Sequence, residues 1–500
     1  MQRRRRGAIV GATIAVAVLG GYMVADAFDV VPGLLTTSTA PAPEDPPDLI
    51  DQSGPQMSVV SSDQAAPVSA DAVRALWSGM ADAAAEGSWN AWGMVMDPAS
   101  GDVLLDQSSS AVHTPASTTK ILTAVSALSH LDETATLSTG TSLVGTDLYL
   151  WGQGDLMLAR GQGDPDAVDG HAGVADLAAE TAEALQGRGI TQVTLRWHHA
   201  IFSGDSHLAA WDAQEVSDYE GRVGAFAIDG GRVEPGVDQG FSDDPGRDAA
   251  LELAAGLRDR GVEAVVTGEA AIPAGAEEIA HVESATVGQQ VRWMLHHSDN
   301  TLADQYCRLA AGAAADGETT AGAATAGAAT AADPSPSSGD SDGGPSAATV
   351  ATPASADTSY AGATATVAST LTSLGVDTSG LVMEDCSGLS TNDRISAKTL
   401  VEALNASMNA DAPALRDLVR SLPWGGLDGT LDSRLDQGAA AANVQAKTGS
   451  LPSVSSLAGV LTTSGGRTLV FAIGNDQVPD DAAYWTRGYI DDFIEGLAGL

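Results

Sequence analysis

Two stretches of low complexity limit which parts of this chain can build a packed core. Residues 36–68 are rich in Pro, Ser, Thr, Ala and Asp. Residues 311–358 contain a repeated Thr-Ala-Gly-Ala-Ala followed by Pro, Ser, Gly and Asp, with no aromatic or basic residue. Such sequences bury too little apolar surface to offset the entropy of ordering the chain. We therefore predict a disordered spacer at 36–68 and a disordered insertion at 311–358.

The N-terminus has the composition of an export signal. Four arginines at residues 3–6 precede nineteen uncharged, mostly apolar residues at 7–25. A helix of that length nearly spans a bilayer core and keeps the arginines on the cytoplasmic side. The alternative is a cleaved signal peptide that ends at Ala25-Asp26-Ala27. We predict that residues 1–35 are a membrane anchor or a signal peptide, and the length favours the anchor. Both place the rest of the chain outside the cytoplasm, anchored at the outer face of the cell membrane or secreted.

The charge balance excludes one class of partner. The chain has 24 Lys and Arg against 65 Asp and Glu, a net charge of −41. A nucleic-acid binder needs basic surface to displace the counterions of phosphates, so we expect no nucleic-acid partner. Only three of the cations are lysines: Lys120, Lys398 and Lys447. Because a desolvated lysine can lose its proton and arginine cannot, each lysine is a candidate functional residue.

Hydrophobic periodicity predicts the order of helices and strands. The first folded part reads as a helix from Ser69, a β-hairpin over residues 92–106 and a helix from about Ser117. Residues 142–285 alternate short strands and helices. One continuous helix is predicted over residues 287–309. The C-terminal part predicts a hairpin over residues 454–473 and a last helix over residues 482–497.

The motif Ser117-Thr118-Thr119-Lys120 is the first candidate site. On a helix, residues three apart share one face, so the Ser117 hydroxyl and the Lys120 amine can meet. A lysine can take the proton of a serine nucleophile if burial lowers its pKa. Taken alone, this pattern is more often an ordinary helix start with an exposed lysine.

Two later motifs supply groups that suit the same chemistry. In Ser298-Asp299-Asn300, the serine could relay a proton to a leaving amine and the asparagine could hold a substrate amide, although such sequences are common at helix starts. In Lys447-Thr448-Gly449-Ser450, a strand would place Lys447 and Gly449 on one face and the hydroxyls on the other. A permanently charged lysine beside hydroxyls suits a carboxylate, and the glycine leaves room for a ligand. The alternative is an edge-strand lysine that blocks aggregation.

The order S-x-x-K, S-x-N, K-T-G is the signature of penicillin-recognising serine enzymes. With this order, the chain resembles the low-molecular-mass class C penicillin-binding proteins, the D-alanyl-D-alanine carboxypeptidase/endopeptidases of peptidase family S13. Ser117 and Ser298 lie 181 residues apart, far more than in class A β-lactamases. The resemblance covers roughly residues 70–500 without the insertion, and it is closest at residues 148–155, 298–304, 385–390, 427–431 and 447–459. Cys386 stands where the family has glycine, and Asp304 where it usually has glutamate.

The resemblance implies an α/β (α+β) fold. It implies a penicillin-binding transpeptidase-like domain, with a central antiparallel sheet flanked by helices, and an accessory domain inserted between the first two motifs. The catalytic domain would then be built from residues 69–141, 286–310 and 359–500, and the accessory domain from residues 142–285. This insert is shorter than usual for the family, which implies a reduced accessory domain.

The resemblance also implies an acyl-enzyme cycle with no metal and no organic cofactor. Ser117 would attack the carbonyl between two terminal D-alanines, Lys120 would be the general base, and Ser298 would pass the proton to the departing D-alanine. The backbone N–H groups of Ser117 and Ser450 would form the oxyanion hole. The substrate-binding residues would be Asn300 for the peptide amide, and Lys447, Thr448, Gly449 and Ser450 around the terminal carboxylate.

The implied partners are peptidoglycan stem peptides that end in D-Ala-D-Ala, and β-lactams as covalent inhibitors of Ser117. Both carboxypeptidase and endopeptidase action fit the resemblance. Two other functions stay open: a catalytically weak cell-wall scaffold and a β-lactamase. The cysteines, Cys307 and Cys386, bracket the insertion. In an oxidising compartment they could form a disulfide, and two buried free thiols are an equal alternative.

Overall fold

A computed structural model describes residues 65–234, 236–237, 239–326, 356–479 and 482–500. The predicted anchor at residues 7–25, most of the predicted spacer and the part of the predicted insertion at residues 327–355 lie outside these ranges. Within them, no helix is both long enough and apolar enough to cross a membrane.

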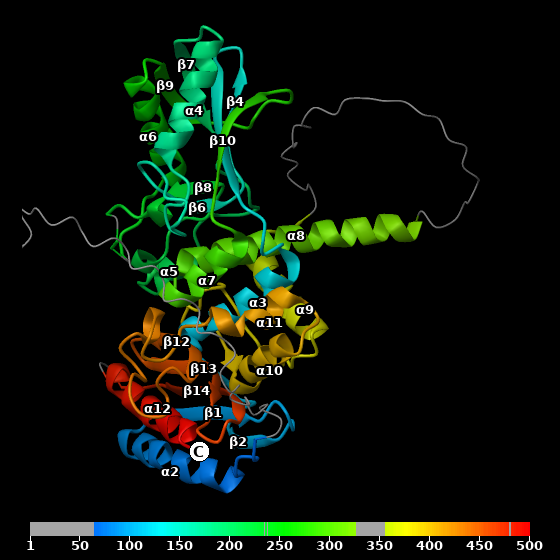
Figure 1. Cartoon of the computed structure of the whole chain (residues 1–500), viewed down its shortest axis with the longest axis vertical. Helices are drawn as coiled ribbons and strands as arrows, with labels where there is room; N and C mark the ends of the chain where they lie inside the picture. The colour runs from blue at the N-terminus through cyan, green and yellow to red at the C-terminus, as the bar shows by residue number, and fades with distance from the viewer. Residues whose placement is uncertain (1–64, 235, 238, 327–355, 480–481) are drawn as a thin grey trace, which may run out of the picture. The chain divides into compact units, whose positions relative to one another are not determined.

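A five-stranded antiparallel sheet lies at the centre of the part of the chain that carries the K-T-G motif (Figure 1). Its order is β12-β13-β14-β1-β2, with bounds β1 Asn90–Met96, β2 Val103–Gln107, β12 Val444–Leu451, β13 Val454–Thr462 and β14 Thr468–Asp476. Both predicted hairpins are confirmed, since β1 pairs with β2 and β13 pairs with β14. Strand β14 is buried almost throughout because helices cover both faces of the sheet.

Helices α2 (Ala70–Gly87) and α12 (Ala483–Ala498) pack against each other and cover one face of this sheet. Helix α2 begins after Ser69, as predicted, and buries Val73, Trp77, Met80 and Ala84 along one stripe. The Trp77 ring meets the Phe493 ring of α12 edge-on, with centroids 5.5 Å apart. Helix α10 (Ala397–Met408) covers the other face.

Helix α3 (Lys120–His130) lies in the middle of the helical layer and is buried from Lys120 to Leu128. It packs against helices α7, α8, α9, α10 and α11, with bounds α7 Val287–His297, α8 Asn300–Ala326, α9 Tyr360–Ser373 and α11 Pro413–Asp417. Two short strands, β3 (Val112–His113) and β11 (Ile395–Ser396), pair beside it. The short 3-10 turns in this part are η5 Val419–Ser421 and η6 Gly429–Leu431.

The prediction of one continuous helix over residues 287–309 is wrong. Helix α7 ends at His297, Ser298 adopts a left-handed conformation with φ of 57°, and α8 starts at Asn300. The Asp299 carboxylate accepts the Leu302 N–H at 2.9 Å and so caps the new helix. Periodicity misses this break because the helices on both sides of it keep apolar residues at helical spacing.

The predicted start of the insertion at residue 311 is also wrong. Helix α8 continues to Ala326, and Ala311 belongs to the hydrophobic core. Alanine is the best helix former, so an alanine-rich sequence that follows a packed helix can extend it. The composition of residues 311–326 indicated disorder, but these residues extend the helix that precedes them.

The accessory domain has a sheet and a core of its own, between the first two motifs (Figure 1). The sheet order is β10-β4-β5-β7-β9, with bounds β4 Ser138–Val144, β5 Asp147–Gly152, β7 Gln192–Trp197, β9 Glu263–Glu269 and β10 Glu277–Glu283. Strands β5, β7 and β9 run parallel, whereas β4 is antiparallel to both neighbours. Helices α4 (Val174–Gly187) and α6 (Pro245–Asp259) pack on it.

Smaller elements connect the accessory sheet to the catalytic part. Strands β6 (Asp155–Leu158) and β8 (Phe226–Ile228) pair in parallel. Helix α5 (Ala209–Ala213) and the 3-10 turns η3 (Ser217–Tyr219) and η4 (Asp229–Gly231) follow β7. The described chain therefore has the predicted α+β architecture of a helix-flanked antiparallel sheet with an inserted second sheet.

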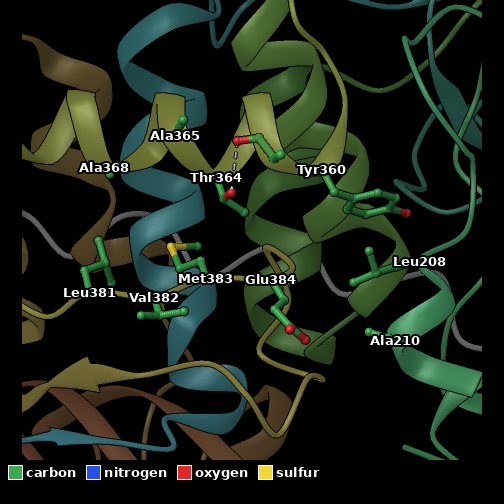
Figure 2. A pocket seen from close by; sticks show the side chains of 11 residues that line it. Leu208, Ala210, Tyr360, Thr364, Ala365, Ala368, Leu381, Val382, Met383 and Glu384 are labelled. Carbon is green, nitrogen blue, oxygen red and sulfur yellow. Dashed lines mark hydrogen bonds between the residues drawn. The ribbon is translucent and has the colours of Figure 1, made fainter. Parts of the chain in front are cut away.

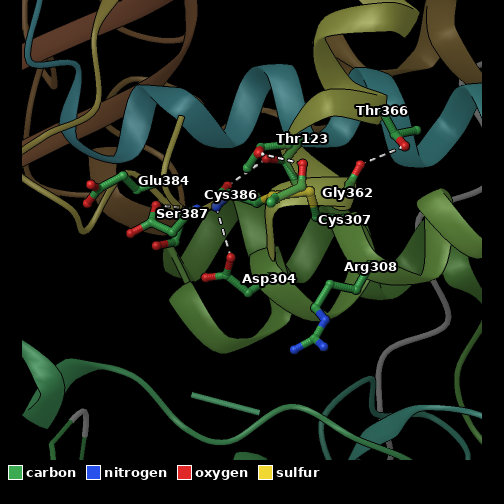
Figure 3. The surroundings of a disulfide bond; sticks show 12 residues. Thr123, Asp304, Cys307, Arg308, Gly362, Thr366, Glu384, Cys386 and Ser387 are labelled. Atoms are coloured by element: carbon green, nitrogen blue, oxygen red, sulfur yellow. Dashed lines mark hydrogen bonds between the residues drawn. A yellow bond between two sulfur atoms is a disulfide. The ribbon is translucent and has the colours of Figure 1, made fainter. Parts of the chain in front are cut away.

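Cys307 of α8 and Cys386 form a disulfide (Figure 3). Of the two alternatives for these cysteines, the structure shows the bridge. Around it, the Cys386 N–H donates to Asp304 at 2.8 Å and the Thr123 hydroxyl donates to the Cys386 carbonyl at 2.5 Å. The bridge therefore joins α8 to a loop that lies against α3.

We predict that the variant Cys307→Ala/Cys386→Ala loses about 4 kcal/mol of unfolding free energy, because the bridge closes a loop of 79 residues in the unfolded chain. Urea denaturation of the oxidised protein and of the variant measures the difference. Reduced wild-type protein is the control, since it lacks the bridge but keeps both side chains. Two thiols titrated in denatured, non-reduced wild-type protein would contradict the bridge.

Candidate active site

Ser117 lies in a 3-10 turn, η2 (Ala116–Thr119), that leads directly into α3. The hydroxyls of Thr118 and Thr119 close this turn by donating to the carbonyls of Pro115 and Ala116, at 2.8 and 2.9 Å. The turn leaves Ser117 partly exposed and directs Lys120 into the interior, where it is fully buried.

The Lys120 amine has three hydrogen-bond partners. Its Nζ lies 2.7 Å from Asn300 Oδ1, 2.7 Å from the Ser387 carbonyl and 3.0 Å from Ser117 Oγ. A neutral amine has two N–H groups and one lone pair. The two carbonyl-type acceptors can take the N–H groups, which leaves the lone pair for the Ser117 hydroxyl proton.

Burial also favours the neutral form of Lys120. Desolvation lowers the pKa of Lys120 to about 8, against the opposing effect of nearby carboxyl groups, of which Glu220 is the strongest. An amine with such a pKa is still mostly charged near pH 7, but its neutral fraction is far larger than that of an ordinary lysine. Geometry and protonation together allow Lys120 to act as a base toward Ser117.

The second motif meets the third at Ser298. The Lys447 amine donates to Ser298 Oγ and to the Thr448 carbonyl, each at 2.9 Å. Lys447 is fully buried, and among the described residues it forms no ion pair with a carboxylate. Burial, and then the charge of Lys120, lower the pKa of Lys447 well below its ordinary value. This differs from the permanent charge predicted from the K-T-G sequence.

Strand β12 carries the K-T-G motif at the edge of the sheet and alternates its side chains as predicted. Lys447 points toward Ser298, whereas the Thr448 hydroxyl donates to Thr430 Oγ1 at 2.8 Å. On the same side as Thr448, Ser450 Oγ accepts a hydrogen bond from Arg487 at 2.8 Å.

The sequence predicts that glycine at position 449 leaves room for a ligand, but the structure shows a different reason for this glycine. A Cβ at this position would lie 2.7 Å from the Pro115 carbonyl oxygen, which is too close for any other residue. The glycine therefore lets β12 pack directly against the turn that holds Ser117. The space expected for a ligand is occupied by the chain's own backbone.

Two cavities meet at Ser117. One of about 660 Å³ extends toward Arg232 and Trp293, and one of about 780 Å³ extends toward Ser450 and Arg487. Ser117, Tyr219 and Asn300 line both. Predicted site residues from all three motifs thus surround one cleft, with the two lysines buried behind its wall.

A separate cavity of about 530 Å³ runs along α9 (Figure 2). Its lining is mostly apolar, with Leu208, Tyr360, Leu381 and Met383 among its residues, and it contains none of the motif residues. It is not part of the cleft at Ser117.

With this geometry in place, the comparison with known proteins identifies the chain. The D-Ala-D-Ala carboxypeptidase 3 (S13) family matches it over residues 76–254 and 347–494, which is more than half of its length. The chain belongs to this family.

Two relatives agree with this membership over most of their length. A carboxypeptidase of Mycobacterium tuberculosis is 32% identical over 401 residues, which cover 78% of this chain and 77% of the relative. Carboxypeptidase DacB of Mycolicibacterium smegmatis is 33% identical over 405 residues, 77% of this chain and 76% of the relative.

The fold agrees with a solved structure. Penicillin binding protein 4 of Haemophilus influenzae superposes with a TM-score of 0.61 at 20% identity, covering 84% of this chain and 98% of that chain. The resemblance to family S13 and the expected fold are therefore confirmed.

The S13 site also uses groups that the motifs do not reveal. One is the Ser387 carbonyl, which Asp385 holds in place. The Asp385 carboxylate accepts backbone N–H groups from Ser387, Gly388 and Ser390 at 3.1, 2.7 and 2.7 Å, and the Trp211 indole N–H at 2.8 Å. The family match at residues 385–390 was the sequence signal for this loop, but it did not assign a role.

Glu220 is a second group that sequence reasoning missed. It is 2% exposed, and neither carboxyl oxygen has a hydrogen-bond partner in the part of the chain that the structure describes. Burial and the neighbouring Asp304 raise the pKa of Glu220 well above its ordinary value. The shift favours the neutral form of Glu220, which weakens the attraction by which this carboxyl group favours the charged form of Lys120. No motif marked this residue.

We predict that penicillin acylates this S13 protein faster as the pH rises through about 8. The base must be neutral, and the neutral fraction of Lys120 grows as the pH passes its pKa of about 8. The second-order acylation rate, measured from pH 6 to 10 with folding checked by circular dichroism, should rise and then level off. A rate that is flat or falls through pH 8 would contradict Lys120 as the base.

Proposed function

We propose that this S13 chain is a serine-type D-Ala-D-Ala carboxypeptidase that trims peptidoglycan stem peptides through an acyl-enzyme on Ser117. The observation that carries the proposal is the contact of a buried, neutralisable Lys120 with Ser117, next to a Ser298–Lys447 pair. Membership of the family supports the substrate class.

Acylation starts at Ser117. Its Oγ attacks the carbonyl between the two terminal D-alanines while Lys120 takes the hydroxyl proton. The backbone N–H groups of Ser117 and Ser450 stabilise the oxyanion. Ser298, held by Lys447, gives its hydroxyl proton to the departing D-alanine, and the proton that Lys120 took from Ser117 replaces it. Water then releases the shortened peptide from Ser117.

The substrate is held from both sides of Ser117. Asn300 presents its amide in the cleft and binds the peptide amide. Thr448 and Ser450 offer their hydroxyls to the terminal carboxylate, with Lys447 behind Ser298, while Gly449 lets β12 pack against the turn that holds Ser117. The Arg487 guanidinium donates to Ser450 Oγ and lines the cavity on the side where the rest of the stem peptide extends out of the cleft. β-Lactams acylate Ser117 in the same way and leave slowly.

We further propose that the protein works outside the cytoplasm, anchored at the outer face of the membrane through residues 7–25, or secreted if residues 1–27 are cleaved. The support is the arginine-led apolar sequence and the proposed substrate, which belongs to the cell wall. An additional endopeptidase action on cross-linked peptides fits the same acyl-enzyme chemistry.

Incubation with a D-Ala-D-Ala muropeptide and with a cross-linked dimer tests the function. We expect mass spectrometry to show loss of one D-alanine from the muropeptide. Cleavage of the dimer would add endopeptidase action. Rapid penicillin hydrolysis without peptide cleavage would indicate a β-lactamase, and a protein that neither cleaves peptide nor binds fluorescent penicillin would indicate a scaffold.

We predict that Lys120→Arg nearly abolishes penicillin acylation. Arginine keeps the charge but does not release its proton in a protein, so the base is lost. The matched control is Lys398→Arg, because Lys398 lies in α10 and forms ion pairs with Asp377 and Glu402 at 2.6 and 3.1 Å. Lys398→Arg should acylate at the wild-type rate. A near-normal rate for folded Lys120→Arg would overturn the assignment of the base.

A further inference from the structure

The first turns of α12 carry an exposed aromatic surface. Tyr484 is 66% exposed, Trp485 74% and Tyr489 41%, while Ile490 and Phe493 on the other side of the helix are buried. Aromatic residues make up only 4% of this chain, and large rings are mostly buried in folded proteins. Three exposed rings so close together indicate an interaction surface.

A fourth ring extends this surface. Trp89 follows the end of α2 and lies against Tyr489, with ring centroids 5.9 Å apart and the planes tilted by 35°. We call Trp485, Tyr489 and Trp89 the aromatic strip. Trp485 and Tyr489 are four residues apart, so they lie on one face of the helix.

The aromatic strip is continuous with the active-site cleft. Tyr484 and Arg487 line the cavity of about 780 Å³ that contains Ser117. The Arg487 guanidinium lies over the Tyr484 ring at 5.0 Å, and the Tyr484 ring meets the Trp485 ring edge-on at 5.6 Å. A ligand bound in the cleft therefore passes beside the aromatic strip where it extends out of the cavity.

We propose that the aromatic strip binds sugar rings of the glycan strand that carries the stem peptide, an inference that rests on the proposed function. The face of an aromatic ring is negative and attracts the polarised C–H groups of a sugar, while the Tyr hydroxyl and Trp N–H can bond its hydroxyls. A stem peptide of about five residues spans at most about 17 Å. The strip extends about 8 Å along α12 from the cavity rim, so the glycan is within reach.

The surroundings of the aromatic strip favour this partner over two others. The exposed Glu86 precedes Trp89 by three residues, and the exposed Asp492 follows Tyr489 by three residues. The chain also carries a net charge of −41, so an anionic membrane surface is repelled. A stable dimer needs about 20 to 30 residues on each side, far more than these few rings. Neither the negative charge nor the small size of the aromatic strip argues against binding of uncharged sugar rings.

The test compares wild-type protein with Trp485→Ala/Tyr489→Ala. We expect the affinity for peptide-free wall glycan, measured by co-sedimentation and calorimetry, to fall about 10-fold, the size of two lost ring contacts. Cleavage of a synthetic tripeptide ending in D-Ala-D-Ala should be unchanged. Trp485→Phe/Tyr489→Phe should keep most of the affinity. Leu251→Ala, which removes an exposed apolar side chain of α6, is the matched control and should change nothing.

Glycan binding is also measured with wild-type protein whose Ser117 is acylated by penicillin. This protein cannot cleave peptide but should still bind the glycan, so the measurement tests the aromatic strip independently of the proposed function. Glycan binding by a protein that cleaves no peptide would overturn the proposed function alone. The inference is overturned if wild-type protein does not bind peptide-free glycan, or if the alanine variant binds it equally. It is also overturned if the aromatic strip instead mediates binding to phospholipid vesicles or self-association. If the double variant does not fold, Trp485→Gln carries the same expectation.

Discussion

Two buried lysine amines determine how the residues around Ser117 are arranged. Lys120 and Lys447 are both fully buried, and neither amine is hydrogen-bonded to a carboxylate within the described residues. Removing an ammonium group from water costs several kcal/mol, so acceptors must be in place to receive its N–H groups. Those acceptors come from α8, from the loop after residue 384 and from the break between α7 and α8. The same burial that demands this support also lowers the pKa values of both lysines, which is what acyl-transfer chemistry requires of a base.

The support extends into the segment between strands β7 and β9 of the accessory sheet. Trp211 of α5 donates to Asp385, the residue that shapes the loop around Ser387. The Asn300 amide donates to the Tyr219 carbonyl at 2.9 Å, which fixes the side chain whose oxygen receives Lys120. On the other side of this loop, the disulfide holds Cys386 to α8. The inserted sequence therefore contributes one wall of the cleft as well as a separate domain.

Sequence reasoning was strongest where chemistry depends on local spacing. The S-x-x-K spacing predicted that Ser117 and Lys120 share one face, and the alternation along a strand predicted which way Lys447 and Thr448 point. It was weakest where a long-range contact decides the outcome. The helix break at Ser298 and the burial of Ala311 depend on what packs against α7 and α8, and no local pattern encodes that.

The family, the order of the three motifs and the residue types that carry the chemistry can be identified from the amino-acid sequence, because these are properties of local order along the chain. The protonation of those residues and the contacts that hold them depend on the folded chain. The lowered pKa of Lys120, the raised pKa of Glu220 and the packing of Gly449 against Pro115 all depend on segments distant in the sequence. Desolvation acts through space, and for that reason the linear sequence does not display it.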